Sequence, residues 1–210
     1  MLNFSKKSAT ENQTIETGKI RPPRRWRCNV IFAAMNPTLL QLQREIASSL
    51  RGLDANQTQL HPPAHPGKWS IQQIVEHLLL TYSATETAIN ARLAKRTPTR
   101  AQSTLRQRIF QYAVCRCGYF PLGREAPAMV MPQPTTHPLN GEALTHATAE
   151  HLAHLDPLFA EAEVLFGPAS QFASHAVLGP LNIDQWRLFQ LVHGRHHLKQ
   201  IAAIRRAHNV

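Results

Sequence analysis

The stretch NIDQWRLFQLVHGRHHLKQ, residues 182–200, is central to the fold prediction. Asn182 followed by Gln185 is typical of a capping box, which begins a helix. At about 100° per residue, one face of this helix carries core residues and histidines together. The residues within about 40° of one line on that face are Trp186, Phe189, His193, His197, Gln200 and Ile204. The pattern predicts a core-facing helix with two histidines on its buried stripe.

The fifteen prolines leave long windows in which further helices are expected. These proline-free windows are residues 38–61, 67–97, 99–120, 139–156 and 181–210. Asn36 followed by Pro37 is typical of a helix start. Ser70 with Gln73 forms a second capping box, which opens the longest predicted helix.

The predicted third long helix starts near Gly141 and meets Pro157. Proline lacks a backbone donor and clashes with the preceding turn, so the helix should kink or split at Asp156. An additional short amphipathic helix is indicated by Leu105, Ile109, Tyr112 and Phe120, and a proline-rich loop follows over residues 121–138. No stretch alternates as a β-strand does. We therefore expect an all-α fold, a four-helix bundle with an extra short helix and a proline-rich loop between helices two and three.

The formal net charge of +10 comes from two segments. Residues 1–34 have a net charge of +5 and residues 87–124 have +8, whereas the rest of the chain sums to −3. Residues 1–34 lack periodicity and are expected to form a basic, disordered extension, followed by a helical domain over residues 35–210. A basic run is more often a solvated helix face than a nucleic-acid site, and no recognition motif accompanies this one. Nucleic acid is therefore not the favoured partner.

Hydropathy and cysteine content point to a cytoplasmic protein. No apolar run approaches the roughly 18 residues that a membrane span needs, and the N-terminal segment has no signal-peptide core. An odd number of cysteines does not indicate a disulfide framework. Cys115 and Cys117 form a CxC motif, for which reduced structural thiols are favoured over metal binding or redox exchange.

His193 and His197 are spaced as a bidentate metal site on one helix face. Two core histidines satisfied by hydrogen bonds are the alternative, and this motif alone does not decide between them. His77 lies on the flank of the helix that starts at Ser70, from which an adjacent helix could supply a third nitrogen. Three histidines without a thiolate leave at least one coordination position for water or substrate. His77, His193 and His197 are therefore the predicted ligands of a divalent ion.

Several other residues are candidates for the surroundings of this site. His196 points about 60° off the stripe and is expected beside the ligands or in solvent. His151 is either an additional ligand or a histidine of the core or its rim. The candidate pocket residues are Gln73, Trp69, Tyr82, Trp186 and Gln200.

The helix of residues 182–200 also has a second apolar face, opposite the histidines. This face carries Leu188, Leu191 and Leu198. Either the middle segment of the chain or a second subunit must cover it. The second of these alternatives predicts a homodimer.

Two stretches stand out in combination. One is Gly67-Lys68-Trp69-Ser70 leading to Glu76-His77-Leu78, and the other is Leu178-Gly179-Pro180-Leu181 followed by Trp186 and His193-Gly194-Arg195-His196-His197-Leu198-Lys199-Gln200. They resemble the DinB-like superfamily of metalloenzymes. The resemblance covers about residues 36–208 and also touches the loop Arg124-Glu125-Ala126-Pro127. It implies a right-handed, up-down-down-up four-helix bundle in which His77, His193 and His197 bind a divalent ion.

Some members of that superfamily are metal-dependent transferases that use a low-molecular-weight thiol, and other branches are isomerases or uncharacterised. We therefore expect a metal-dependent enzyme of transferase or hydrolase type. Its ion, for which Zn, Ni and Fe are all suitable, would activate a thiol or water for attack on a small-molecule substrate. The alternative is a non-catalytic helical binding module with a structural or vestigial histidine site.

Overall fold

The computed structural model describes residues 34–120 and 126–210. The long helices are α1 (Pro37–Leu50), α2 (Ile71–Lys95), α4 (Gly141–Phe166) and α5 (Ile183–His208). The shorter elements are η1 (Gln57–Gln59), α3 (Leu105–Cys115), η2 (Ala128–Val130), β1 (Ala173–His175) and β2 (Gly179–Leu181). Residues 34–210 form one compact unit. The predicted disordered extension, apart from residue 34, lies outside the described residues.

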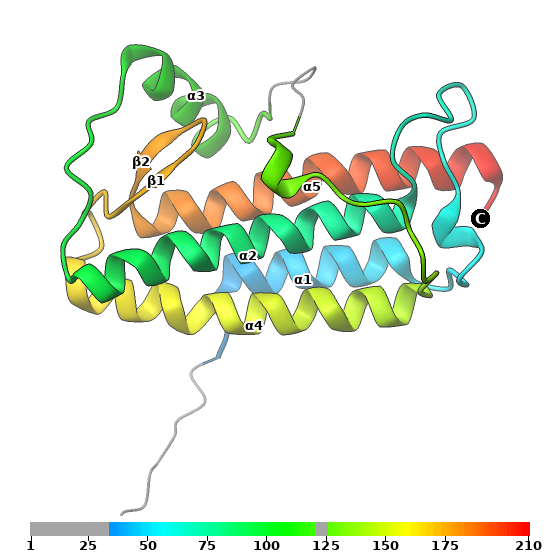
Figure 1. Ribbon diagram of the computed structural model, residues 1–210, viewed down its shortest axis with the longest axis horizontal. Coiled ribbons are helices and arrows are strands. Elements are labelled where there is room, and N and C mark those ends of the chain that lie inside the picture. Colours follow the sequence, from blue (N-terminus) through cyan, green and yellow to red (C-terminus); the bar gives the residue numbers. More distant parts are fainter. Residues whose placement is uncertain (1–33, 121–125) are drawn as a thin grey trace, which may run out of the picture. The chain divides into compact units, whose positions relative to one another are not determined.

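The four long helices lie lengthwise beside one another (Figure 1). Following the colours along the chain, α1 and α5 run in one direction, and α2 and α4 run in the other. Helix α2 packs against α4, and α1 packs against both α4 and α5. Helix α3 and the β1–β2 hairpin lie near the N-terminal end of α5 (Figure 1). The prediction of a mainly helical fold is confirmed.

The predicted helix starts are confirmed because they depend on local hydrogen bonds. Asn36 caps α1, where its Oδ1 accepts from the backbone N–H of Thr38 at 3.0 Å. Complete capping boxes open α2 at Ser70 and α5 at Asn182. Each side chain satisfies an N–H group that has no partner within the helix.

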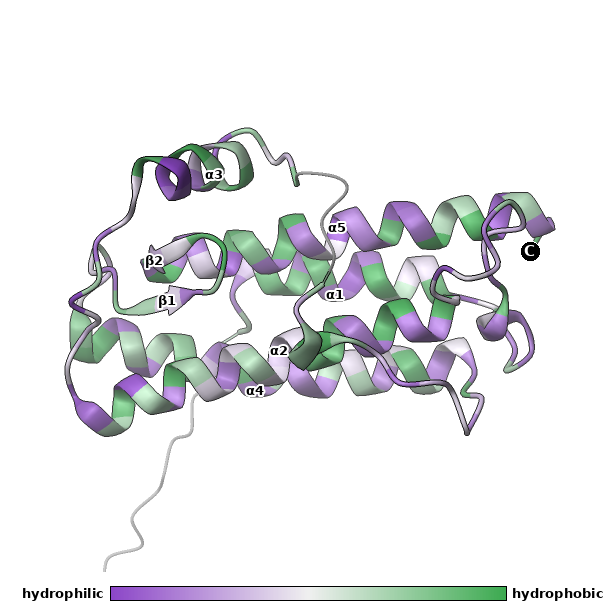
Figure 2. Ribbon diagram, turned by 45° about the horizontal axis from the view of Figure 1, so that its top comes forward, coloured by the Kyte–Doolittle hydropathy of each residue, from purple (hydrophilic) through white to green (hydrophobic). Residues whose placement is uncertain are grey.

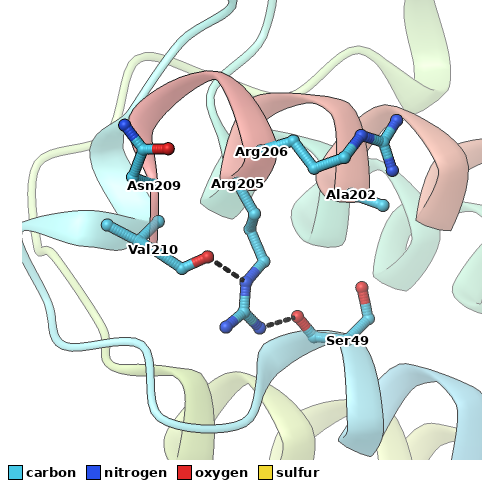
Figure 3. Close-up of a pocket in the computed structure, with 6 residues that line it drawn as sticks. All are labelled: Ser49, Ala202, Arg205, Arg206, Asn209 and Val210. Atoms are coloured by element: carbon cyan, nitrogen blue, oxygen red, sulfur yellow. Dashed lines mark hydrogen bonds between the residues drawn. The ribbon is translucent and has the colours of Figure 1, made fainter.

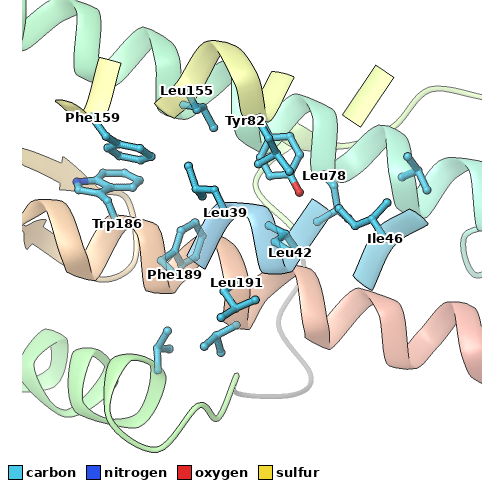
Figure 4. Packing of buried hydrophobic residues seen from close by; sticks show 14 of the residues in the cluster. Leu39, Leu42, Ile46, Leu78, Tyr82, Leu155, Phe159, Trp186, Phe189 and Leu191 are labelled. Carbon is cyan, nitrogen blue, oxygen red and sulfur yellow. The ribbon is translucent and has the colours of Figure 1, made fainter. Parts of the chain in front are cut away.

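The apolar core lies between the long helices, and each of these helices carries hydrophobic and hydrophilic bands (Figure 2). Its fully buried side chains include Leu39, Leu42, Ile46, Leu78, Tyr82, Leu155 and Phe159 (Figure 4). A Cβ at Gly194 of α5 would overlap Leu42 Cδ1 of α1. Gly194 therefore permits the close approach of α5 to α1, one residue away from His193.

Of the two predicted outcomes, a kink or a split at Asp156, the split is wrong, because α4 continues through Pro157 from Gly141 to Phe166. Pro157 and Ala153 both lie on the exposed face of the helix. The carbonyl of Ala153, which loses its usual donor, can therefore be solvated. On the opposite face, fully buried Leu155 and Phe159 hold both halves of the helix in the core.

The β1–β2 hairpin was not expected, because three-residue strands are too short to show a period of two. The strands pair antiparallel, with Ala173 opposite Leu181. His175 supports the turn, since its Nδ1 accepts from the backbone N–H groups of Val177 and Leu178, both at 3.1 Å. Its ring packs on Phe189 of α5, with a centroid distance of 4.4 Å.

Helix α3 turns its predicted apolar stripe outward rather than inward. Leu105, Ile109 and Tyr112 are 76%, 59% and 64% exposed, whereas Gln111 and Val114 are buried. The reason is a tertiary one, because the Gln111 amide donates to the carbonyls of Leu178 (2.7 Å) and Pro180 (3.1 Å) in and beside the hairpin. The polar side chain thus fixes the inward face.

Acidification should destabilise the protein through His175. Burial lowers the pKa of His175 to about 4, whereas an unfolded histidine titrates near 6.5. Between these values the unfolded state binds the additional proton, so the free energy of unfolding should fall as the pH drops from about 6.5 to 4. Urea denaturation of the metal-free protein at several pH values measures this slope.

The His175→Ala variant isolates that contribution, because the other buried histidines titrate in both proteins. It should be less stable at pH 7 and should show a smaller loss of stability on acidification than the parent. His154→Ala, on an exposed surface, is the matched control. If the unfolding free energy of His175→Ala depended on pH as strongly as that of the parent, the assignment of this effect to His175 would be contradicted.

Candidate metal centre

Helices α2 and α5 bring three histidine side chains to one place. His77 comes from α2, and His193 and His197 come from successive turns of α5. The His193 Nε2 lies 3.2 Å from His77 Nε2 and 3.0 Å from His197 Nε2. All three side chains are buried, and they form a group that could hold a metal ion.

Two of these rings have their other nitrogen fixed by an acceptor. His77 Nδ1 donates to the carbonyl oxygen of Val130 in η2 at 2.7 Å, and His197 Nδ1 donates to Gln200 Oε1 at 2.9 Å. A neutral imidazole carries one N–H, so the Nε2 atoms of both rings present lone pairs to the centre of the cluster. Histidine ligands are commonly oriented in this way by a second hydrogen bond.

A single proton cannot satisfy this arrangement. If His193 carried its hydrogen on Nε2, it could donate to the Nε2 atom of either His77 or His197. The Nε2 lone pair of the remaining histidine would then have no donor. A cation at the centre instead binds three Nε2 lone pairs at once. A cation could therefore satisfy all three rings, which one shared proton cannot do.

The two short nitrogen separations, both from His193 Nε2, are compatible with metal coordination. With bonds of about 2.05 Å, tetrahedral angles place two ligand nitrogens about 3.3 Å apart, and right angles place them about 2.9 Å apart. The observed 3.0 and 3.2 Å fall between these values. Three nitrogens on one side of an ion leave the other side for water or substrate.

Burial favours the neutral form of the three rings, which is the form that binds metals. Burial lowers the pKa of His77, although its bond to the Val130 carbonyl opposes the shift. The pKa of His197 falls to about 3, mainly through burial and then through repulsion from His77. Burial also holds the pKa of His193 well below its ordinary value, with further repulsion from the neighbouring histidines.

Aromatic rings surround the cluster. Trp69, next to the cap of α2, lies 4.9 Å from His77 between ring centroids. Phe120 lies 5.0 Å from His193, and Phe189 stacks on the same ring at 5.2 Å. Apolar rings packed beside a polar cluster lower the local dielectric. Val130 and Phe120 were not foreseen as site residues, since a backbone carbonyl and a lone loop aromatic have no sequence signal.

The other predicted site residues divide into two groups. Gln200 and His196 lie at the cluster, because Gln200 bonds His197 and its Nε2 lies 3.2 Å from His196 Nε2. Gln73, Tyr82 and Trp186 have no hydrogen bond or ring contact to the three histidines within the described residues. Gln73 completes the α2 capping box, Tyr82 is buried in the core, and Trp186 donates to the Ala173 carbonyl at 3.3 Å.

The remaining histidine and thiol candidates lie elsewhere. His151 faces Glu86, with 3.6 Å between Nδ1 and Oε1, and does not belong to the three-histidine group. Cys115 and Cys117 are free thiols. Burial raises the pKa of Cys115 to about 11, which opposes formation of a reactive thiolate. Cys28 lies outside the described residues.

A separate cavity of about 450 Å³ lies at the C-terminal end of α5 (Figure 3). Its lining residues are Ser49, Ala202, Arg205, Arg206, Asn209 and Val210. Arg205 is already engaged there, because its guanidinium donates to the carbonyls of Ser49 (2.6 Å) and Val210 (3.2 Å). This cavity shares no lining residue with the histidine cluster.

Residues 40–203 match the family model described as a protein of unknown function, DUF1569. The chain belongs to the DUF1569 family. The match includes the whole of α2 and most of α5, so all three clustered histidines lie within the DUF1569 region. No curated protein and no solved structure matches the chain. The part of this DUF1569 protein that the structure describes has no helix with the length and hydropathy of a membrane span.

Proposed function

We propose that the chain is a metal-dependent enzyme in which His77, His193 and His197 hold a divalent ion. The observation that carries the proposal is that His193 Nε2 lies 3.2 Å from His77 Nε2 and 3.0 Å from His197 Nε2, both of which present lone pairs. When bound, the ion supplies Lewis acidity, which lowers the pKa of a thiol or water and makes it a nucleophile. The reaction class is a thiol-dependent transfer or a hydrolysis on an electrophilic small molecule.

The surrounding residues have positioning and shielding roles in this proposal. Val130 and Gln200 fix the rotation of two ligand rings through their Nδ1 atoms. Trp69 and Phe120 cover the cluster with apolar surface, which strengthens electrostatic interactions there. His196 lies beside His197, with ring centroids 5.0 Å apart, and is half-buried.

We also propose that the fold is a DinB-like four-helix bundle. Helices α1 and α5 run in one direction and α2 and α4 run in the other, which supports an up-down-down-up order (Figure 1). A histidine from the second long helix and two from the last support the same ligand set as in the resemblance. The thiol co-substrate rests on this resemblance alone.

We also propose a homodimer, although not through the second apolar face of α5, because that face is covered within the chain. Helix α3 packs against α5, and Leu191, on the second apolar face of α5, is only 6% exposed. The exposed apolar residues Leu105, Ile109 and Tyr112 of α3 now support self-association better. Sedimentation velocity at increasing protein concentration measures the oligomeric state.

Activity should depend on both the ion and the cluster. Protein loaded separately with Zn²⁺, Ni²⁺ or Fe²⁺ is assayed on electrophilic substrates with small thiols or with water as nucleophile. We expect turnover with at least one ion, and a loss of about 100-fold or more in His197→Ala, because removal of a ligand disrupts the site. His65→Ala, an exposed histidine outside the cluster, is the control and should behave as the parent.

The binding-module alternative gives a different result. It expects no metal-dependent turnover in any of these assays and a partner interaction that survives chelation. That pair of results would overturn the enzymatic proposal while leaving the fold unaffected.

A further inference from the structure

His193 differs from the other two clustered histidines in its second nitrogen. His77 Nδ1 has the Val130 carbonyl and His197 Nδ1 has Gln200 Oε1, but His193 Nδ1 is buried with no hydrogen-bond partner among the described residues. An unpaired buried nitrogen costs free energy and calls for an explanation.

One turn earlier in α5, Gln190 has the complementary defect. Its side chain is fully buried, and its Oε1 also has no partner among the described residues. Residues three apart on a helix are neighbours, and helical side chains lean toward the preceding turn. The His193 ring follows this rule, because it stacks on Phe189 with an interplanar angle of 9°.

The orientation of the Gln190 amide is determined by its surroundings. Its Nε2 donates to Thr85 Oγ1 of α2 at 2.9 Å, while that hydroxyl donates its only hydrogen to the Thr81 carbonyl at 2.8 Å. Thr85 Oγ1 can therefore only accept from Gln190. The amide nitrogen must face Thr85, and the oxygen at the other end of the amide is left as an unused acceptor.

We infer that Gln190 is a positioning residue for the metal centre, accepting a hydrogen bond from His193 Nδ1 when His193 Nε2 binds the ion. This inference rests on the proposed metal function. Coordination through Nε2 places the ring hydrogen on Nδ1, which makes that atom a donor. The chain His193–Gln190–Thr85–Thr81 then links α5 to α2, the two helices that supply the ligands.

Tyr82 provides a matched control within the same region. Its hydroxyl is a second buried donor without a partner among the described residues, and it belongs to the apolar core. If the inference is correct, the Gln190 acceptor acts on His193, and Tyr82→Phe leaves metal affinity unchanged.

The experiment measures Zn²⁺ affinity by competition with a chromophoric chelator, on the full chain. Gln190→Met, which keeps the length but removes the acceptor, should weaken affinity by about 10- to 100-fold. Thr85→Val should weaken it less, because Gln190 keeps its acceptor but loses its anchor. Gln190→Glu should bind Zn²⁺ more tightly than Gln190→Met, since the acceptor is restored, whereas a purely structural role predicts that a buried carboxylate is worse than methionine.

A second readout does not depend on affinity. In ¹H–¹⁵N spectra of the zinc-loaded parent, the Nδ1–H signal of His193 should exchange slowly with solvent, and this protection should be lost in Gln190→Met. Denaturation of each metal-free variant confirms that it is folded. If the parent binds Zn²⁺ and Gln190→Met binds it equally well, this inference is overturned and the proposed function stands. If the parent binds neither Zn²⁺ nor Ni²⁺ nor Fe²⁺, both are overturned.

Discussion

Replacing His193 with alanine should reduce metal content from about one ion per chain to none at micromolar protein concentration. Structural zinc sites with four ligands have apparent binding free energies of about 10–16 kcal/mol, or about 3 kcal/mol for each ligand. Loss of one nitrogen therefore weakens binding by about 100-fold or more. His193 should be the most sensitive of the three, because its Nε2 is the atom close to both other ligands.

The measurement is elemental analysis of untagged protein, followed by titration with Zn²⁺ and Ni²⁺. His77→Ala and His197→Ala should also lose the ion, since each removes one nitrogen, but their affinity for Zn²⁺ should fall by a smaller factor than that of His193→Ala. His65→Ala is the control, because His65 is exposed and is not in the three-histidine group, whereas His196→Ala tests whether the neighbouring histidine is itself a ligand. Retention of the ion by His193→Ala together with its loss from His196→Ala would reassign the ligand.

The second large effect concerns the start of α4. Gly141→Ala should lower the free energy of unfolding by about 2 kcal/mol, as expected for overpacking. A Cβ at Gly141 would overlap the backbone oxygen of Leu50, at the end of α1, and would lie 3.3 Å from Leu53 Cβ. The Gly141 N–H also donates to the Leu53 carbonyl at 2.9 Å, so this backbone cannot move aside without losing a hydrogen bond.

Chemical denaturation of the metal-free protein measures this loss. Gly67→Ala is the control, because a Cβ there meets nothing within 4 Å. It should change stability by less than about 0.5 kcal/mol, as surface substitutions usually do. Equal stability of Gly141→Ala and Gly67→Ala would show that the α1–α4 junction is looser than the structure indicates.

Features that depend on nearby residues were accessible from the sequence. The capping boxes at Ser70 and Asn182 are local, because each joins residues three apart. The buried stripe of α5 follows from helical periodicity, which places His193 and His197 together one turn apart. Proline positions marked the interruptions between helices, although exposed Pro157 showed that a proline on the solvent side need not end one.

Features that depend on distant segments required the tertiary structure. Helical periodicity could not reveal that Gln111 would bond the hairpin and turn Leu105 and Ile109 outward. The sequence also indicated Tyr82 and Trp186 as candidate pocket residues, whereas their contacts lie in the core and not at the histidines.

By itself, therefore, the sequence determined the helical class, the helix starts and the pairing of two histidines on one face. Only the tertiary structure showed that His77 contacts His193, which is 116 positions away in the sequence. Only the tertiary structure showed that the Val130 carbonyl accepts a hydrogen bond from the His77 ring. The physical reason is the sequence distance over which each interaction acts. Caps and helical stripes are set within about one turn by backbone geometry, whereas the facing of two helices is set by packing of the whole core.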